Sequence, residues 1–352
     1  MKKNYFMLAA ATMMFAACAE TDLVNEISVE EAPKAIEFDA FANKTTRAAI
    51  NSVVGLQTEG EFTVWGWKYQ ESTPTQIFNA QQVIYDEEEG WGYTPTQYWD
   101  KTATSYKFYA VAPKAGNATY SITNEKNIKI ENVSSGDGKT ATDYLIDREG
   151  VTIDNIAENQ VPNIGEEIEF KFSHIMSKIT VVVKHNVTSN ATPQPTVVLT
   201  NLAMSGWNNS KGTFTQDKMV EKEVTDDPKT EEVESGTEEV LEEWELTENN
   251  KSGNHAFLTS AEEAKTLNKT DLVEIGSYLM VPQKDVDLKF TISYKIGEET
   301  FLAHTGTIEN QTWETNTHYT YTIIVGPSSI QFGTPTITNW TIGNTGNGTT
   351  IQ

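Results

Sequence analysis

The sequence predicts an all-β protein with two domains, and three features support this prediction. Short apolar runs recur every 8–12 residues or so, roughly the strand spacing of a β-sandwich, and they are rich in threonine, valine, isoleucine and aromatic residues. No segment shows a strong helical period of apolar residues. The chain has 352 residues, which suits two domains of ordinary size once a leader is removed.

The first residues form a secretory signal that ends at a cysteine. Lys2 and Lys3 precede a short apolar stretch, and small alanines lead to Cys18, the only cysteine of the chain. The ending Phe-Ala-Ala-Cys resembles a bacterial lipobox, in which cleavage before the cysteine is followed by acylation of its thiol. We therefore expect residues 1–17 to be a lipoprotein signal peptide and Cys18 to carry the lipid, palmitate included. The alternative is an ordinary signal peptide that happens to contain a cysteine.

A predicted strand follows an acidic linker. Ile36, Phe38 and Ala40 occupy every second position of residues 35–42, and polar residues fill most of the positions between them. This alternation is typical of a strand with one buried face.

Arg47 follows that strand in a polar stretch between two apolar segments. It is one of only two arginines in the chain, the other being Arg148. Polar connections of this kind are frequent sites of proteolysis. Two interpretations stay open: a processing site, with cleavage between Arg47 and Ala48, or an ordinary loop between the first two strands.

The body of the chain contains further predicted strands of the same kind, each bounded by turn residues. A short helix is predicted after Ser260, because Ser260 and Glu263 match a capping box. The predicted strands span residues 61–67, 105–112, 168–172, 178–183, 196–199, 278–281, 288–296, 301–308 and 319–325.

Residues 217–248 form an acidic insertion. They contain 14 acidic residues against 3 lysines, which accounts for nearly half of the net charge of −24. Such a run is usually a solvated loop. The spacing of Val240, Leu241 and Trp244 would also allow one helical turn against the body. Calcium binding by the acids is a further alternative, although no D-x-D-x-D-G loop is present.

The sequence carries none of the common signatures of a catalytic or metal site. The five histidines form no H-x-x-x-H or H-E-x-x-H motif, and G-x-S-x-G, the P-loop and G-x-G-x-x-G are missing. We expect no enzyme, no metal and no cofactor, although distant carboxylates could pair as in a glycoside hydrolase. The charge of −24 argues against nucleic-acid binding. The eight tryptophans and thirteen tyrosines fill cores or form a sugar-stacking platform.

Several short motifs follow one another along most of the chain. They are the lipobox at Cys18, the strand before Thr45-Thr46-Arg47-Ala48, Tyr98-Trp99 with residues 106–113, residues 172–179, residues 279–283, residues 313–325, and Ile337-Thr338-Asn339-Trp340. In this order and spacing the sequence resembles the fimbrillin family, the type V pilins of Gram-negative anaerobes. That family includes the major and minor fimbrial antigen-like lipoproteins.

The resemblance implies two tandem transthyretin-like β-sandwich domains. They follow the signal peptide and a propeptide, residues 18–47, that contains the first strand. The N-terminal sandwich would span residues 48–165 and the C-terminal sandwich residues 166–352. His174 would be a structural residue in the strand that opens the second domain.

The resemblance also implies a mode of assembly. An arginine-specific protease would cut after Arg47 and remove strand 35–42. The vacated groove would then take a strand from the next subunit. The donor would be residues 329–340, with Ile330, Phe332, Ile337 and Trp340 as its apolar residues. The tail after Trp340 is short and polar, whereas some members have longer apolar ends, so a shaft, tip or anchor role stays open.

Two functions are therefore predicted. The first is a structural or adhesive subunit of surface fimbriae, held in the outer membrane as a lipoprotein and then assembled with other fimbrial subunits. A host or bacterial surface ligand would be a further partner. The alternative is a surface glycan-binding lipoprotein of a nutrient-uptake system.

Overall fold

The computed structural model of the chain describes residues 33–41, 56, 60–113, 118–154, 167–221, 237–247, 253–327 and 329–340. These residues form twenty-three strands and one three-residue 3-10 helix, η1 (Ala261–Glu263). The prediction of an all-β fold is therefore confirmed. In the described part of the chain no helix is long and apolar enough to span a membrane. Residues from Lys34 onward form one compact unit.

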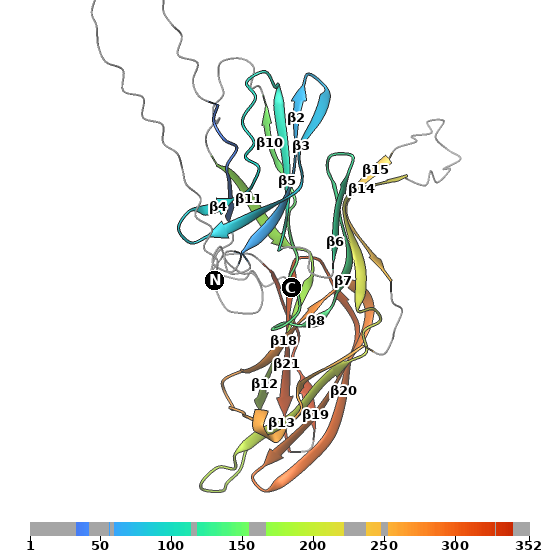
Figure 1. Cartoon of the computed structure of the whole chain (residues 1–352). Helices are drawn as coiled ribbons and strands as arrows, with labels where there is room; N and C mark the ends of the chain where they lie inside the picture. The colour runs from blue at the N-terminus through green and yellow to red at the C-terminus, as the bar shows by residue number, and fades with distance from the viewer. Residues whose placement is uncertain are drawn as a thin grey trace, which may run out of the picture. The chain divides into compact units, whose positions relative to one another are not determined.

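The largest sheet has eight strands and contains the first strand of the chain (Figure 1). Its central strands are rich in aromatic and β-branched residues, which favour a pleated, buried surface. Its order is β1 (Phe38–Phe41), β11 (Ile168–His174), β9 (Leu145–Asp147), β5 (Ser105–Ala112), β2 (Glu61–Gln70), β3 (Thr73–Asp86) and β4 (Gly90–Gly92), with β10 (Val151–Asp154) paired to β5.

Three further sheets complete the fold. The six-stranded sheet is β22 (Ile330–Phe332), β21 (Thr317–Val325), β12 (Ser177–His185), β18 (Val273–Met280) and β8 (Gly136–Asp137), with β23 (Thr336–Asn339) paired to β21. The five-stranded sheet is β16 (Asn254–Leu258), β13 (Val197–Ser205), β19 (Gln283–Ile296) and β20 (Glu299–Trp313), with β17 (Lys265–Thr266) paired to β13. The four-stranded sheet is β15 (Thr237–Leu246), β14 (Lys211–Glu221), β7 (Asn127–Ser134) and β6 (Thr119–Thr123).

The buried apolar residues gather in three clusters. The N-terminal cluster lies on one face of the eight-stranded sheet, and its large members are Phe38, Phe62, Phe78, Phe108 and Phe170. The central cluster joins the opposite face of β2 and β5 to the four-stranded sheet, with Trp65, Trp67, Tyr109, Ile130 and Phe214 among its members. The C-terminal cluster lies between the six- and five-stranded sheets, with Val181, Leu199, Phe290, Tyr294 and Tyr321 among its members.

The eight-stranded sheet curls so that its two ends approach each other. Strands β1 and β3 are far apart in the order of the sheet, yet the rings of Phe38 and Phe78 lie 5.2 Å apart, centroid to centroid. The strong twist of long strands allows such a curl. The first strand of the chain therefore closes the N-terminal cluster.

The chain changes from the first sheet to the next between His174 and Ser177. Strand β11 pairs with β1 and β9, so it completes the eight-stranded sheet, whereas β12 belongs to the six-stranded sheet. From the sequence we expected the boundary after residue 165, and His174 in the strand that opens the second domain. His174 is the last residue of β11, which pairs with β1 and with β9.

The acidic insertion contains paired strands. Strands β14 and β15 pair from Gly212 with Leu246 to Glu221 with Thr237, and β14 also pairs with β7. The expected helical turn at Val240, Leu241 and Trp244 is wrong, because these positions lie in β15. Residues 222–236 of the insertion lie outside the described residues.

The predicted capping box gives a single 3-10 turn. The Glu263 amide donates to the Ser260 carbonyl over 3.3 Å, and the Glu263 carboxylate accepts from the Thr259 amide over 3.0 Å. The turn stops after three residues because residues 265–266 pair with β13 as β17.

Candidate functional site

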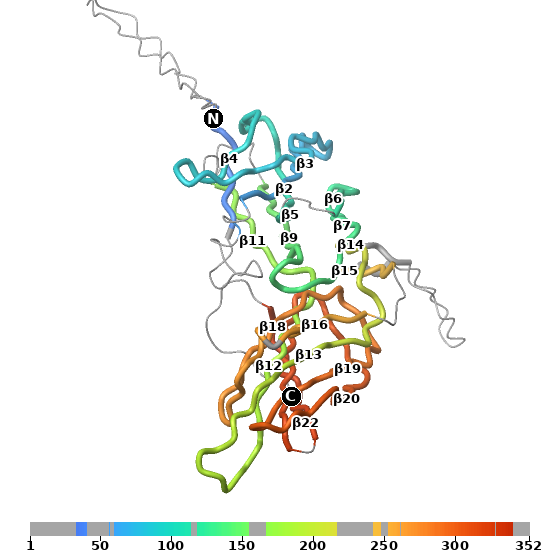
Figure 2. The backbone as a smooth tube through the Cα atoms, turned by 60° about the horizontal axis from the view of Figure 1, so that its bottom comes forward, coloured from blue at the N-terminus to red at the C-terminus, as the bar shows by residue number. Residues whose placement is uncertain are grey.

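The first strand fills a groove at the edge of the eight-stranded sheet. The expected alternation is present: Ile36 is 1% exposed, Phe38 is 3% exposed and Ala40 is 1% exposed. Strand β1 runs parallel to β11 in a register that pairs Phe38 with Ile168. In Figure 2 the segment coloured for the first described residues lies near β11. The groove is therefore occupied by side chains of the first strand of the same chain.

Aromatic rings form the floor of this groove. The ring of Phe38 lies 5.2 Å from that of Phe78, 5.5 Å from Tyr93, 5.9 Å from Phe108 and 5.7 Å from Phe170. Edge-to-face and offset contacts at these separations add to the stabilisation from burial itself. Removal of Phe38 would uncover four rings at once.

Backbone and hydroxyl hydrogen bonds hold the same segment. The Ile36 amide donates to the Gln97 carbonyl over 2.9 Å, and the Tyr93 hydroxyl donates to the Ile36 carbonyl over 2.7 Å. The Ile168 amide donates to the Glu37 carbonyl over 2.8 Å. Burial raises the pKa of Tyr93, which keeps its hydroxyl protonated as a donor. If the strand left, these donors and acceptors would lose their partners.

The C-terminal segment pairs with its own chain. Strands β22 and β23 both pair antiparallel with one edge of β21. Strand β12 pairs with the opposite edge of β21. The ring of Phe332 lies 5.6 Å from that of Phe290 in the C-terminal cluster. Gly306 in β20 makes room for it, because a Cβ there would lie 2.3 Å from the Phe332 ring.

The predicted donor residues differ in burial. Ile330 and Phe332 are half-buried and pack against the C-terminal cluster, and Ile337 is 39% exposed. Trp340 is 4% exposed and belongs to the central cluster. The segment would have to leave β21 before it could pair with another subunit.

Trp340 stacks on a buried histidine. Its ring lies 3.6 Å from that of His174 at an interplanar angle of 7°, and the Lys178 ammonium lies 5.8 Å from the centroid of the indole. His174 Nδ1 lies 3.0 Å from an oxygen of Asp143, and both side chains are buried. Burial lowers the pKa of Lys178, while the carboxylates of Asp143 and Glu274 oppose that shift. The sequence placed Trp340 in the donor but gave no sign of this stack.

His318 lies beside this stack. Its Nε2 is 2.8 Å from the Thr180 hydroxyl oxygen. Burial, and then the positive charge of Lys178 and the His174 ring, lower the pKa of His318 to about 4. At neutral pH the His318 ring is therefore uncharged.

Arg148 joins the first sheet to β15 through its contacts with Ser173 and Glu242. Its guanidinium donates to the Glu242 carboxylate, to the Ser173 hydroxyl and, over 2.8 Å, to the His174 carbonyl. The Gln216 amide donates to the Arg148 carbonyl. One of the two arginines of the chain is thus fixed by side chains from β11, β14 and β15.

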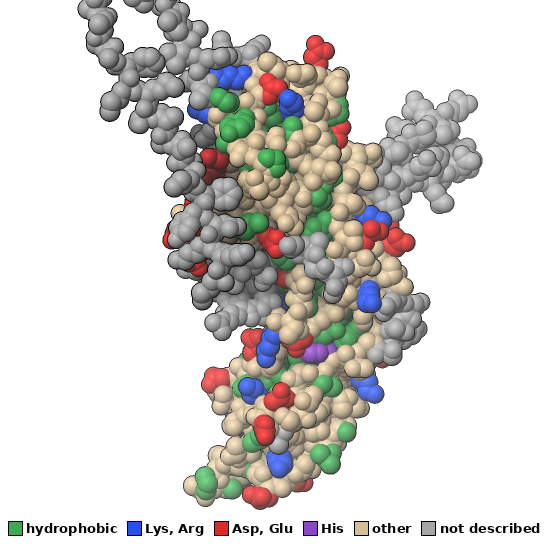
Figure 3. Space-filling model, viewed as in Figure 1, with side chains coloured by type: hydrophobic (Ala, Val, Ile, Leu, Met, Phe, Trp, Pro, Cys, Tyr) green, Lys and Arg blue, Asp and Glu red, His purple; other side chains and the backbone are tan. Residues whose placement is uncertain are grey.

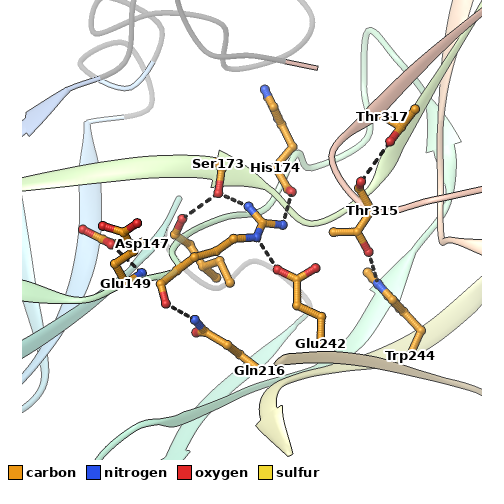
Figure 4. Close-up of polar contacts among 11 residues, drawn as sticks. Asp147, Glu149, Ser173, His174, Gln216, Glu242, Trp244, Thr315 and Thr317 are labelled. Carbon is orange, nitrogen blue, oxygen red and sulfur yellow. Dashed lines mark hydrogen bonds and ion pairs between the residues drawn. The ribbon is translucent and has the colours of Figure 1, made fainter. Parts of the chain in front are cut away.

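The neighbouring contacts in Figure 4 tie β15 to the turn before β21. Trp244 Nε1 donates to the Thr315 hydroxyl over 3.1 Å, and the Trp244 ring lies 5.5 Å from that of Phe214. The acidic insertion therefore contributes an ion pair and a packed indole to the fold, which the expectation of a solvated loop missed. Its signal in the sequence was Trp244 itself, because a large aromatic residue seldom sits in a purely solvated run.

A cavity of about 460 Å³ lies between β2, β3 and β6. Trp65 and Trp67 line it, but they are only 2% and 7% exposed, so their rings are packed rather than open. Exposed amides of Gln76, Asn79 and Asn124 surround it.

The described residues show no cluster of metal-ligating side chains. Within the described ranges, no three His, Cys, Asp or Glu side chains are grouped so that they could hold a metal ion. On the face shown in Figure 3, acidic and basic side chains are interspersed. Cys18, Arg47 and Ala48 lie outside the described residues, as do the signal peptide, residues 1–17, and most of the propeptide.

Comparison with solved structures relates this fold to fimbrial proteins. A fimbrial protein of Bacteroides vulgatus superposes with a TM-score of 0.51 and 17% identity, over 88% of this chain and 100% of that one. The tip fimbrial protein Mfa3 of Porphyromonas gingivalis gives a TM-score of 0.36 and 10% identity, over 88% of this chain and 100% of that one. No curated protein matches the sequence. The profile of the fimbrillin-like family matches residues 46–340, which is most of the sequence, and the chain therefore belongs to the fimbrillin-like family.

Proposed function

We propose that the protein is a structural or adhesive subunit of surface fimbriae that joins its neighbours by exchange of a strand. It is exported as a lipoprotein through Cys18 to the outer membrane, cut between Arg47 and Ala48, and assembled with other fimbrial subunits. Its role is structural rather than catalytic. The observation that carries this proposal is the segment of β1 and the residues just before it, whose Ile36, Phe38 and Ala40 seal an aromatic groove.

The strand that leaves is stabilised enough to keep the groove closed before cleavage. Full burial of Ile36 and Phe38 contributes about 1.5–3 kcal/mol each as an upper estimate. While the segment is covalently attached, it has a high effective concentration at the groove. A cut after Arg47 removes that advantage, so the peptide can dissociate and a strand from another subunit can replace it.

The proposed donor is residues 329–340. Ile330 and Phe332 have the two-residue spacing of Ile36 and Phe38. In the uncut chain the donor is paired with β21, so donation exchanges one set of backbone hydrogen bonds for another. Release of Trp340 from His174 would accompany donation of the whole segment.

The fixed side chain of Arg148 bears on where the protease acts. Its guanidinium is tied to Glu242, Ser173 and the His174 carbonyl, and it lies within a paired and packed region. Proteases need an extended, accessible segment around the bond they cut. We therefore expect an arginine-specific protease to cut the folded chain after Arg47 and to leave Arg148 intact.

An assembly assay with matched variants tests this proposal. After treatment with an arginine-specific protease, the wild type should form polymers on an unheated denaturing gel, whereas Arg47→Ala and Arg47→Lys should stay monomeric. In a Lys44→Ala background, which removes the trypsin site three residues upstream, limited trypsin should restore assembly of Arg47→Lys but not of Arg47→Ala, because trypsin also cuts after lysine. Polymers from protease-treated Arg47→Ala would exclude this processing step.

A surface glycan-binding lipoprotein is the second candidate function. The cavity between β2, β3 and β6, lined by the half-buried Tyr120 and by exposed amides, is the observation that favours it. Sugar sites combine aromatic surface with a few polar groups. Quenching of tryptophan fluorescence by polysaccharide in a stable monomer would support this candidate over the first.

A further inference from the structure

Two short segments of the chain share an apolar pattern and differ in charge. Residues 35–40 read Ala-Ile-Glu-Phe-Asp-Ala, and residues 329–334 read Ser-Ile-Gln-Phe-Gly-Thr. Isoleucine and phenylalanine occupy the same places in both. Glu37 and Asp39 of the first segment correspond to Gln331 and Gly333 of the second. These are the strand that leaves and the strand that enters in the proposed exchange.

Carboxylates face one another where β1 lies beside β11. The parallel register pairs Asp39 with Glu169, and Phe38 with Ile168. Paired residues of adjacent strands point to the same side of the sheet. Because Phe38 and Ile168 are buried, Asp39 and Glu169 lie together on the outer face. Like charges directly opposite each other weaken strand pairing.

The same register brings a second acidic residue of each strand together. The Ile168 amide donates to the Glu37 carbonyl, so the exposed residues Glu37 and Glu167 adjoin one residue before the pair of Phe38 and Ile168. Burial and then the negative charges of Asp39, Glu37 and Glu169 raise the pKa of Glu167. Four carboxylates thus border one short strand pair.

Other charged residues lie near this strand pair in the described part of the chain. Lys34 precedes β1, and Lys171 of β11 is paired with Phe41, two residues beyond Glu169. On the β9 side, Asp147 accepts backbone amides, including that of Lys171, and Glu149 adds a further negative charge.

We propose that the carboxylates of β11 select the strand that occupies the groove, disfavouring acidic β1 and accepting the uncharged C-terminal segment of a second copy of this chain. In the bound copy, Ile330 takes the place of Ile36, and Phe332 takes the place of Phe38. The inference rests on the proposed function, because it names the partner strand and the force that favours its entry.

The absence of charged residues in the C-terminal segment supports this choice of occupant. Residues 329–340 contain no aspartate, glutamate, lysine or arginine. In the proposed register Gln331 faces Glu167, and Gly333 faces Glu169. The exchange therefore keeps the two large apolar side chains in the groove and removes two contacts between like charges. It also favours the incoming strand over reassociation of the cleaved acidic peptide.

Amide hydrogen exchange in the uncut chain tests the electrostatic part without any cleavage. The variant Glu37→Gln/Asp39→Asn should slow exchange of the amides in residues 35–41 about fivefold at low ionic strength. The difference should shrink at about 0.5 M salt, where surface charges are screened. The control Glu298→Gln/Glu299→Gln removes the same charge from the turn after β19 and the first residue of β20, and it should leave this exchange unchanged. Equal rates in wild type and Glu37→Gln/Asp39→Asn would overturn the inference.

Assembly of cut subunits tests the choice of partner. Gln331→Glu should slow polymer growth about fivefold, because its carboxylate meets Glu167. Gln331→Lys changes the charge by the same amount with opposite sign and should not slow growth. Glu167→Gln combined with Gln331→Glu should restore the wild-type rate.

The two assays separate this inference from the proposed function. If the cut wild type does not assemble, the proposed strand exchange is wrong. The amide hydrogen-exchange rates of the uncut chain still decide whether β11 repels β1. If cut wild type assembles and Gln331→Glu assembles equally fast, the selection by charge is wrong while strand exchange stands.

Discussion

At the residue scale, the junction between β11 and β12 concentrates buried polar groups. His174, with Asp143 at its Nδ1, stacks on Trp340, and His318 is bonded to Thr180 close by. Lys178 is half-buried beside them. Burial lowers the pKa of both Lys178 and His318. Stability at this junction therefore depends on pH.

The titration of His318 gives this dependence a direction. Its pKa is about 4 in the folded chain, below the usual 6.5, so the unfolded chain binds this proton at higher pH than the folded chain does. The stabilisation is present in full above pH 6.5 and is lost as pH falls toward 4. We expect the wild type to lose roughly 2–3 kcal/mol more unfolding free energy across this window than His318→Gln.

Urea unfolding at a series of pH values measures this difference. His304→Gln in β20 is the matched control and should follow the wild type. Parallel curves for wild type and His318→Gln would contradict the assignment.

At the element scale, the two end segments use the same kind of contact at different sheets. Strand β1 packs Phe38 over the rings of the N-terminal cluster, and β22 packs Phe332 over Gly306 and Phe290. Strands β1 and β22 each pair with a single neighbouring strand, so each can open without unfolding the sheet that it borders.

Gly306 controls how firmly β22 is held. In Gly306→Ala the new Cβ would lie 2.3 Å from the Phe332 ring. The ring therefore has to move, and β22 packs less well against β20. We expect faster hydrogen exchange in residues 330–339 and faster assembly after cleavage, with the donor sequence itself unchanged. Gly92→Ala in β4 is the control, because a Cβ at that position would meet nothing within 4 Å. Unchanged exchange in Gly306→Ala would show that Phe332 does not anchor the segment.

At the scale of the whole molecule, the three clusters depend unequally on the first strand. The N-terminal cluster contains Ile36, Phe38 and Ala40, whereas the C-terminal cluster contains no residue of that strand. Arg148 and Trp244 link the first sheet and the acidic insertion to the rest. Loss of β1 should therefore weaken one end of the protein more than the other.

Calorimetry of a cut subunit without its propeptide tests this expectation. Loss of the buried side chains of Ile36 and Phe38 costs about 3–6 kcal/mol of stability. The midpoint temperature of one unfolding transition, that of the N-terminal cluster, should fall by on the order of 10 °C. The transition of the C-terminal cluster should stay in place, and assembly should restore the first. A single unshifted transition would show that the propeptide strand does not support the N-terminal cluster.

Sequence and structure contributed different parts of this picture. Local pattern alone predicted the all-β class and the buried positions Ile36, Phe38 and Ala40, because the two-residue period of a strand is written in adjacent residues. Local spacing misled at Val240, Leu241 and Trp244, where pairing with β14 overrides a helical turn. The pairing of β11 with β9 likewise cannot be read from local sequence.

Only the tertiary structure decided which strands meet. The parallel pairing of Asp39 with Glu169, the stack of Trp340 on His174 and the ion pair of Arg148 with Glu242 each join residues far apart in the chain. The sequence determines what each strand offers on its two faces. Which strand pairs with which depends on hydrogen bonds and packing between residues far apart in the chain. These contacts form only when the whole chain folds.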